Sequence, residues 1–270
     1  MENKVALITG AASGIGKAVA ELLHIKGYHI WLVDINEKAL IDLHKQLSNS
    51  TITLCNLSDK QSIENLSGLI NKSKRLDLAL LNVGVITPGN FLEIPFEKSE
   101  LQLQLNLWST LYLNRICGQK MKEQGFGDIV NTVSMAGIVG LKGSAVYSAS
   151  KFGLRGFLMA FREELKPFNV NVSGIYLSAI DTPMLRAEAI HPNGSPLNFV
   201  SEPVKVERVA ELVLHVVETK KLEYYLPEGE GFSSRILGVF PSLISKLYGY
   251  MEKKGEKGRK KFIEKNNLKT

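Results

Sequence analysis

A serine, a tyrosine and a lysine lie at a spacing that suits acid–base chemistry on a carbonyl or an alcohol. Ser134 closes a short apolar run, and Tyr147 and Lys151 follow near the start of an amphipathic segment. Residues four apart share one face of a helix, so the lysine would stand beside the tyrosine. Free tyrosine titrates near pH ~10, and a nearby ammonium lowers its pKa toward neutrality. We therefore expect Tyr147 to exchange a proton while Ser134 donates a hydrogen bond to the reacting oxygen.

The tyrosine–lysine pair alone is a weak signal. About one such pair is expected by chance in a chain of this kind, and a second occurs at Tyr250 and Lys254. That second pair has Leu237 where the first has Ser134, and it lies in the basic C-terminal segment. The prediction therefore depends on the serine, the tyrosine and the lysine together.

Glycines follow the first predicted strand at a spacing that suits a nucleotide phosphate. The segment Thr9-Gly10-Ala11-Ala12-Ser13-Gly14-Ile15-Gly16 has the pattern G-x-x-x-G-x-G. Glycine turns tightly and lets the backbone approach a pyrophosphate, and the N-terminus of the next helix presents free N–H groups. Because this loop stands between a strand and a helix, it predicts dinucleotide binding by Gly10, Ser13, Gly14, Ile15 and Gly16.

Asp34 ends the second predicted strand, 18 residues after Gly16. A carboxylate at this position accepts hydrogen bonds from both hydroxyls of an adenosine ribose and repels a 2′-phosphate. The following residues, Ile35 and Asn36, are not cationic. The cofactor is therefore predicted to be NAD, with NADP the alternative. Asp34 could instead cap the helix that begins near Glu37, and Lys17 is the one nearby cation that could weaken the preference.

Short apolar runs alternate with helix-length amphipathic segments along most of the chain. This alternation predicts an α/β protein with a doubly wound, Rossmann-like parallel sheet of about seven strands, covered by helices on both faces in a single domain. The predicted strands are residues 5–9, 29–33, 51–55, 77–81, 127–133, 169–175 and 223–226. The predicted helices lie near residues 14–26, 37–48, 60–73, 98–123, 147–166 and 204–219.

Two segments break the alternation. Residues 178–203 are rich in Ser, Pro, Asn and Gly and predict a mobile loop beside the substrate. Residues 1–230 would form the dinucleotide-binding and catalytic domain, and residues 231–270 an amphipathic helix followed by a basic tail. Pro241 would kink or divide that helix. The helix is interpreted most simply as docked on the core with a solvated tail, and the alternatives are a lid, a subunit contact or a peripheral membrane anchor.

Composition excludes several classes of protein. Residues 252–270 hold eight Lys/Arg against three Glu and so carry +5 of the net charge of +6, which gives no support for nucleic-acid binding by the main domain. The scattered histidines predict no metal site. No apolar run approaches the ~18 residues of a membrane span. With only Cys55 and Cys117 and no disulfide framework, we expect a reducing, cytoplasmic location.

Taken together, these motifs resemble the short-chain dehydrogenase/reductase family over residues 3–226. The matching residues are Thr9 to Gly16, Asp34, Leu81-Asn82-Val83-Gly84, Asn106, Ser134, Tyr147 and Lys151. The resemblance implies that Tyr147 is the general acid/base, that Ser134 polarises the substrate oxygen and that Lys151 holds the nicotinamide ribose. It also implies that Asn106 anchors a water in a proton relay.

The resemblance further implies cofactor contacts outside these motifs. Asn82 and Gly84 would lie along the adenosine side, and Asn56 and Leu57 after the third strand would lie near the adenine. Asn56 stands where the family often has aspartate, and an amide still accepts and donates hydrogen bonds. Residues 177–182 depart from the family's usual P-G motif, although Ile180 and Thr182 could still meet the nicotinamide carboxamide. A homodimer or homotetramer built on the helices at 98–123 and 147–166 is implied as well.

The segments expected to meet the substrate carry mostly apolar side chains. These are residues 135–141 and 183–203, which contain Ile138, Val139, Leu141, Met184, Leu185, Leu197 and Phe199, with Arg186 as a single candidate for an anion. They favour a lipophilic alcohol or ketone (steroid, retinoid, fatty or aromatic), although the same residues could simply pack against the core. The predicted function is hydride transfer between NAD(H) and such a substrate. The alternatives are an NADP(H)-dependent carbonyl reductase and a non-catalytic NAD(H)-binding scaffold.

Overall fold

A seven-stranded parallel sheet forms the centre of the molecule, in the strand order β3-β2-β1-β4-β5-β6-β7. The computed structural model describes residues 4–269. Residues 1–3 of the predicted domain and residue 270 of the predicted tail lie outside this range. The strands are β1 (Val5–Thr9), β2 (His29–Asp34), β3 (Ser50–Leu54), β4 (Leu78–Leu81), β5 (Gly127–Thr132), β6 (Val170–Leu177) and β7 (Glu223–Leu226). All seven predicted strands form. The strand order reverses between β1 and β4, and ligands bind outside the carboxyl ends of the strands at such a reversal.

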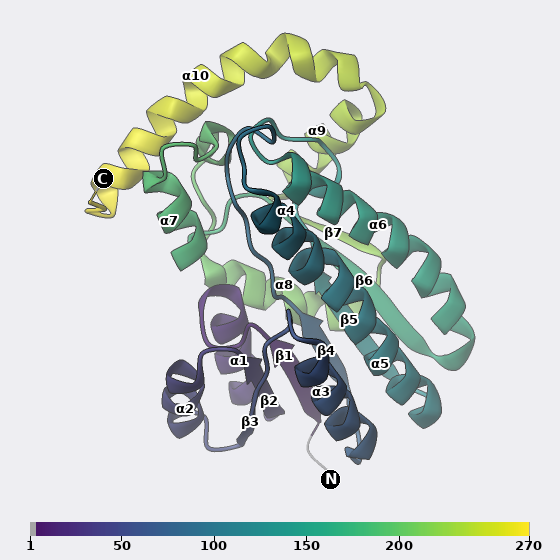
Figure 1. The fold of residues 1–270 in the computed structure, drawn as a ribbon. Coiled ribbons are helices and arrows are strands. Elements are labelled where there is room, and N and C mark those ends of the chain that lie inside the picture. The colour runs from purple at the N-terminus through teal and green to yellow at the C-terminus, as the bar shows by residue number, and fades with distance from the viewer. Residues whose placement is uncertain (1–3, 270) are drawn as a thin grey trace.

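Helices cover both faces of the sheet, as the single Rossmann-like domain predicts (Figure 1). The helices α1 (Gly14–Ile25), α2 (Glu37–Gln46) and α8 (Val206–Thr219) pack on one face through buried residues such as Val19, Leu40 and Val213. The helices α3 (Lys60–Lys72), α5 (Ser109–Gln124) and α6 (Ala145–Leu165) pack on the other through Leu66 and Leu158. The prediction of two covered faces is therefore confirmed.

The helix predicted near residues 98–123 is not continuous. The chain forms α4 (Phe96–Leu103), then one π-helical turn at Gln104–Trp108, and then α5. The Ser109 hydroxyl donates to the carbonyl oxygen of Gln104 inside this turn and to that of Leu57 outside it. Such turns insert one residue into a helix and often lie at functional sites. Here the turn carries Asn106.

The segment predicted as a mobile loop contains regular structure. Residues 178–203 include α7 (Pro183–Ile190) and a 3₁₀ turn at Pro196–Phe199. Thr182 begins α7 by accepting a hydrogen bond from Leu185 N at 3.3 Å. The prediction missed α7 because the helix is short and the Ser, Pro and Gly residues around it are typical of a loop. This helix forms one wall of the site described below.

The C-terminal segment is helical almost to its end, and most of the residues predicted as a basic tail belong to its second helix. Pro241 divides it as predicted, giving α9 (Glu228–Val239) and α10 (Pro241–Lys265). Figure 1 shows α10 running across the top of the molecule toward α7. No helix within residues 4–269 combines the length and the apolar content needed to cross a bilayer.

Two glycines seat α10 directly on the 3₁₀ turn. A Cβ on Gly255 would stand 2.1 Å from the Pro196 carbonyl oxygen, and one on Gly258 would stand 2.0 Å from that of Phe199. The ring of Phe262 packs 5.3 Å from the ring of Phe199. The pattern of basic residues in α10 does not reveal these contacts, because they depend on a turn that is distant in the sequence.

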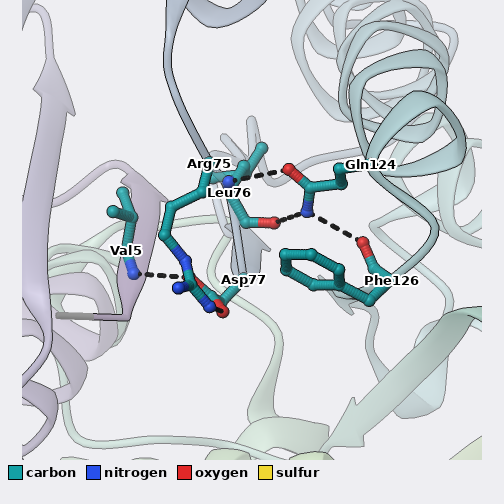
Figure 2. A network of polar contacts seen from close by, with 6 residues as sticks. All are labelled: Val5, Arg75, Leu76, Asp77, Gln124 and Phe126. Atoms are coloured by element: carbon teal, nitrogen blue, oxygen red, sulfur yellow. Dashed lines mark hydrogen bonds and ion pairs between the residues drawn. The ribbon is translucent and has the colours of Figure 1, made fainter. Parts of the chain in front are cut away.

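A polar network holds the amino-terminal edge of the sheet (Figure 2). Asp77, just before β4, accepts hydrogen bonds from the Val5 amide at 2.8 Å and from the Arg75 side chain. Gln124 at the end of α5 accepts a hydrogen bond from the Leu76 amide through Oε1 and donates through Nε2 to the carbonyl oxygens of Leu76 and Phe126. The network lies at the opposite edge of the sheet from the strand ends that carry the candidate site residues, so we assign it a role in stability.

Candidate active site

The glycine loop adopts the backbone that its sequence predicts. Gly10 and Gly14 have φ values of +64° and +51°, a region that favours glycine. A Cβ on Gly16 would stand only 2.1 Å from the Gly10 carbonyl oxygen, so α1 can pack against the loop only without a side chain there. Ser13 occupies the N-cap position of α1 but makes no capping hydrogen bond with its side chain. The first amides of α1 therefore face the open end of the loop.

Asp34 joins the glycine loop to the end of β2. Its Oδ2 accepts a hydrogen bond from the Ala12 amide at 2.9 Å, and its Oδ1 accepts one from the Asn36 amide at 3.0 Å. The side chain of Asn36, not that of Asp34, caps α2 by accepting from Ala39 N. The capping interpretation of Asp34 is therefore wrong. Lys17, the cation that could weaken a preference for NAD, lies 3.8 Å from Glu21.

Ser134, Tyr147 and Lys151 meet where β5 ends and α6 begins. The Ser134 hydroxyl accepts a hydrogen bond from Ala136 N at 3.1 Å, which fixes the short turn after β5. A Cβ on Gly137 in that turn would stand 2.8 Å from the Lys151 carbonyl oxygen. This close approach brings the turn against α6. The Lys151 ammonium lies 5.7 Å from the centre of the Tyr147 ring.

Burial strongly shifts the pKa values of both titratable groups. Burial raises the pKa of Tyr147 to about 12, a hydrogen bond with the Ser134 side chain opposes this shift, and the charge of Glu188 adds to it. Burial lowers the pKa of Lys151 to about 8. The Lys151 ammonium donates to the Thr132 carbonyl at 2.9 Å and is only 3% exposed. A perturbed tyrosine and lysine that share a cavity are candidates for proton transfer.

Asn106 lies beside this pair without lining the cavity. Its amide accepts from Val85 N at 2.7 Å and donates to Val85 O at 2.8 Å, and the residue is fully buried. A Cβ on Gly84 would stand 3.5 Å from Asn106 Oδ1 and 3.7 Å from Lys151 Nζ. The π-helical turn thus brings Asn106 to the same glycine that Lys151 approaches.

A single cavity of about 630 Å³ unites the predicted residues, a size typical of ligand-binding clefts. Every candidate site residue lines it except Gly16 and Asn106, which pack directly behind its wall. The lining candidates are Gly10, Ser13, Gly14, Ile15, Asp34, Asn56, Leu57, Asn82, Gly84, Ser134, Tyr147, Lys151, Ile180 and Thr182. The sequence motifs thus converge on one site, from the glycine loop at one end to Tyr147 at the other.

Polar bonds fix several of these side chains. Asn82 accepts a hydrogen bond from the Thr132 hydroxyl at 3.0 Å, linking the ends of β4 and β5. Asn56 Oδ1 accepts from both the amide and the hydroxyl of Ser58. The unusual segment after β6 is anchored where Ile180 bridges to Val204, and the Thr182 methyl lies 3.3 Å from the Cβ position of Gly14. Residues 177–182 therefore close the cavity over the glycine loop.

The apolar part of the cavity differs in some residues from the prediction. Val139, Leu141, Met184, Leu185 and Leu197 line it as expected. Two of the expected residues instead pack in the interior, Ile138 in the main core and Phe199 against Phe262. The candidate anion partner Arg186 is held by Asp181 in an exposed ion pair at 2.8 Å.

Among the lining residues that were not predicted as part of the site, Leu237, Met251, Ser144 and Glu188 matter for the argument below. Leu237 and Met251 come from α9 and α10, and only the tertiary fold brings them to the cavity. Ser144 and Glu188 are buried and polar, with exposed fractions of 3% and 6%. The available signals were small: Ser144 stands three residues before Tyr147, and Glu188 falls on the inward face of α7 three residues after Leu185.

Within residues 4–269, no group of three or more His, Cys, Asp and Glu side chains is arranged to hold a metal ion. The residues that line the cavity fit a dinucleotide instead: a glycine loop at a helix N-terminus, a carboxylate at the end of β2, and a buried ammonium near Tyr147.

The chain belongs to the short-chain dehydrogenase family. The family's sequence model, described as short chain dehydrogenase, matches residues 4–192. The fold agrees: a short-chain dehydrogenase/reductase of Burkholderia phymatum, solved in complex with NAD, superposes with a TM-score of 0.80 at 20% identity, covering 90% of this chain and 95% of the other. A short-chain dehydrogenase of Sphingobium yanoikuyae, solved in complex with NADPH, gives a TM-score of 0.77 at 21% identity, with coverage of 90% and 95%.

Two curated relatives are more similar in sequence. A 3-oxoacyl-[acyl-carrier-protein] reductase of Rickettsia conorii is 36% identical over 176 residues, which cover 65% of this chain and 72% of the relative. A 3-ketodihydrosphingosine reductase of Mus musculus is 33% identical over 192 residues, covering 67% of this chain and 58% of the relative. The chain is accordingly an oxidoreductase of this family.

Proposed function

We propose that the protein transfers a hydride between NAD(H) and a lipophilic alcohol/ketone pair. One observation carries the proposal: Ser134, Tyr147 and Lys151 open into the same cavity as the glycine loop and Asp34. A non-catalytic scaffold would have no use for a buried ammonium next to a buried tyrosine, because an unpaired charge in such a position destabilises the fold.

The cofactor would donate or accept the hydride. The protein's own residues would bind the cofactor, orient the substrate and transfer the proton. The amides of α1 and the glycine loop would hold the pyrophosphate. Ser134 would donate to the substrate oxygen, and Tyr147 would exchange a proton with it. Lys151 would stabilise the tyrosinate and hold the nicotinamide ribose. Asn106, through Val85 and the Gly84 backbone, would position the wall behind Lys151.

The preference for NAD rests on Asp34. Its two oxygens already accept the Ala12 and Asn36 amides, which orients the carboxylate at the end of β2. A carboxylate so placed has lone pairs for the ribose hydroxyls and repels a 2′-phosphate. Because the fold neighbours were solved with either NAD or NADPH, fold alone does not select the cofactor, and NADP(H)-dependent reduction is the alternative.

The lipophilic substrate rests on the cavity wall and is consistent with the relatives. Residues of five separate segments contribute apolar side chains to the wall: Val139, Leu141, Met184, Leu185, Leu197, Leu237 and Met251. Both relatives are named for a substrate with a keto group at carbon 3, an acyl chain in one case and dihydrosphingosine in the other. We therefore favour a ketone on a long aliphatic chain among the lipophilic substrates.

The decisive experiment titrates the pure protein with NADH and NADPH and follows the fluorescence of Trp31, which lies on β2 close to Asp34. Turnover of aliphatic 3-ketones with the preferred cofactor is measured next. We expect NADH to bind at least about tenfold more tightly than NADPH, and Asp34→Ala to erode that ratio. Preference for NADPH would support the alternative reductase, and binding without turnover of any ketone or alcohol would support the scaffold.

A second candidate property is contact with a membrane surface. The bend between α9 and α10 exposes large apolar side chains: Phe232, Ile236, Val239, Phe240, Leu243 and Leu247. Lysines occupy other positions of α10, as expected of a helix that lies on an anionic bilayer. Co-sedimentation with anionic vesicles tests this: Phe240→Glu should release the protein, and unaltered partitioning would refute the contact.

The exposed side chains on the α5–α6 side support a proposed dimer or tetramer. Trp108, Tyr112, Phe152 and Met159 are between 42% and 66% exposed there, more apolar surface than a solvated helix pair needs. Sedimentation velocity measures the state directly, and a monomer would refute the proposal. Cys55 and Cys117 are buried free thiols, which is consistent with the proposed cytoplasmic location.

A further inference from the structure

Glu188 is a deeply buried carboxylate in the wall of the proposed substrate cavity. It lies on the inward face of α7 with Leu185 and Ala189 and is 6% exposed. Carboxylates are almost never so deeply buried unless a cation pairs with them. Burial raises the pKa of Glu188, while the Ser195 amide, the charge of Arg259 and the Asn198 side chain lower it.

The neighbours of Glu188 satisfy only one side of its carboxylate. Oε1 accepts from Asn198 Nδ2 at 2.8 Å and from Ser195 N at 3.3 Å, and no described residue donates to Oε2. Arg259 of α10 donates instead to the carbonyl oxygens of Ala189 and His191. Among residues 4–269, no lysine, arginine or histidine forms an ion pair with Glu188.

Ser144 provides a second, independent observation at the same cavity. It begins α6, three residues before Tyr147, and is 3% exposed. Its Oγ is buried and has no hydrogen-bond partner among the described residues. A buried hydroxyl without a partner costs about 1–3 kcal/mol unless something hydrogen-bonds to it. Both groups line the cavity, so a ligand there can satisfy both.

We propose that Glu188 and Ser144 bind an ammonium group that the substrate carries on the carbon next to the reacting one. An ammonium has three donors and no acceptor, so it can bond Glu188 Oε2 and Ser144 Oγ together and neutralise the buried carboxylate. A substrate with a carboxylate or phosphate at this position would be repelled. The inference rests on the proposed function, because it takes Tyr147 as the residue beside the reacting carbon.

The position beside the reacting carbon follows from Tyr147. Glu188, Ser144 and Tyr147 all line the cavity, and the charge of Glu188 raises the pKa of the Tyr147 hydroxyl. Ser144 stands one helical turn before Tyr147. An ammonium between them would cancel the effect of Glu188 and favour the tyrosinate. The site therefore selects amino-bearing substrates and also prepares the base for them.

The test compares oxidation of 2-aminododecan-3-ol with that of dodecan-3-ol at neutral pH, where the amine is protonated. The measured quantity is the ratio of the two kcat/KM values, amino alcohol over plain alcohol. We expect the wild-type protein to prefer the amino alcohol and Glu188→Gln to lower the ratio roughly 10- to 100-fold, as for loss of a hydrogen bond to a charged group. Ser144→Ala should lower it roughly 3- to 10-fold.

Glu230→Gln is the matched control. Glu230 also lines the cavity, but its carboxylate already accepts the Ser178 hydroxyl at 2.5 Å, so this variant should keep the ratio within about twofold. Loss of the ratio in Glu230→Gln but not in Glu188→Gln would overturn the assignment. An equal loss for both alcohols in Glu188→Gln would mean that Glu188 only holds Ser195 and Asn198. If Glu188→Gln does not fold, Ser144→Ala and the wild-type preference still decide.

Calorimetric titration with 2-aminododecan-3-ol, with and without NADH, requires no turnover. If no alcohol is oxidised, the proposed function fails. The ammonium site would still be supported if the wild-type protein binds the amino alcohol and Glu188→Gln weakens this binding. If alcohols are oxidised but the wild-type protein prefers dodecan-3-ol, the ammonium site fails and the proposed function stands.

Discussion

Replacing Lys151 by methionine should stabilise the cofactor-free protein at neutral pH while it abolishes turnover. Lys151 is 3% exposed and has no ion-pair partner among the described residues. Burial lowers its pKa from 10.5 to about 8, and at about 1.4 kcal/mol per pKa unit this corresponds to a penalty of about 3 kcal/mol. Methionine has a similar length and no charge, so it removes the penalty.

The expected effect depends on pH in a defined direction. The pKa of Lys151 is lower in the folded than in the unfolded protein, so the folded protein binds fewer protons between pH 8 and 10.5. The penalty of burying the charged lysine is therefore present in full below pH 8 and disappears as the pH rises through this window. The substitution also loses the hydrogen bond to the Thr132 carbonyl, which is worth about 1 kcal/mol at any pH. Lys151→Met should therefore be more stable than the wild type by about 2 kcal/mol at pH 7 and less stable by about 1 kcal/mol above pH 10.5.

Urea unfolding at a series of pH values measures this difference directly. Lys120→Met is the matched control, because Lys120 also donates to a backbone carbonyl, that of Ser73, but is half-buried. We expect no change of sign with pH for this control. A Lys151→Met variant that is less stable than wild type at pH 7, or a difference that does not change with pH, would refute the reasoning from burial.

Three further substitutions test the site and the fold. Tyr147→Phe should lower turnover by about 10²- to 10⁴-fold, as for loss of a general acid or base, and leave the NADH dissociation constant nearly unchanged in a fluorescence titration; normal turnover would refute the role of Tyr147. Gln124→Ala removes hydrogen bonds to Leu76 and Phe126 and should lower the free energy of unfolding by about 2–3 kcal/mol in urea, and a loss below about 0.5 kcal/mol would show that the network is dispensable. Gly258→Ala should displace α10 and raise KM for a lipophilic substrate, because a Cβ would stand 2.0 Å from the Phe199 carbonyl oxygen. Gly249→Ala on the same helix serves as the control, because a Cβ there meets nothing within 4 Å. Equal KM values for the two variants would refute a role of α10 over the cavity.

The motifs that were predictable from the sequence are those whose chemistry depends on local spacing. The glycine loop needs its three glycines within seven residues, because the tight turn, the open helix N-terminus and the close approach of Gly16 to Gly10 all arise inside one strand–turn–helix unit. Tyr147 and Lys151 share a face of α6 for the same local reason. The alternation of strands and helices likewise follows from local hydrophobic periodicity.

Other residues acquired their roles only from distant parts of the chain. The π-helical turn around Asn106 depends on the Val85 backbone and on Ser109 contacting Leu57, which no helical periodicity reveals. Asp34 could have been a cap on α2, and only the structure shows Asn36 in that position and Asp34 bonded to Ala12.

The sequence by itself determined the sheet, the glycine loop and the candidate set of Ser134, Tyr147 and Lys151, because each is encoded by residues close together in the chain. Tertiary structure alone decided what surrounds the substrate. The C-terminal helix packs on the Pro196–Phe199 turn because Gly255 and Gly258 have no side chain to prevent it. Glu188 is a buried carboxylate because α7 places it in the wall of the cavity that Tyr147 also lines. Burial and charge in that cavity depend on packing between segments far apart in sequence, and spacing along the chain does not encode them.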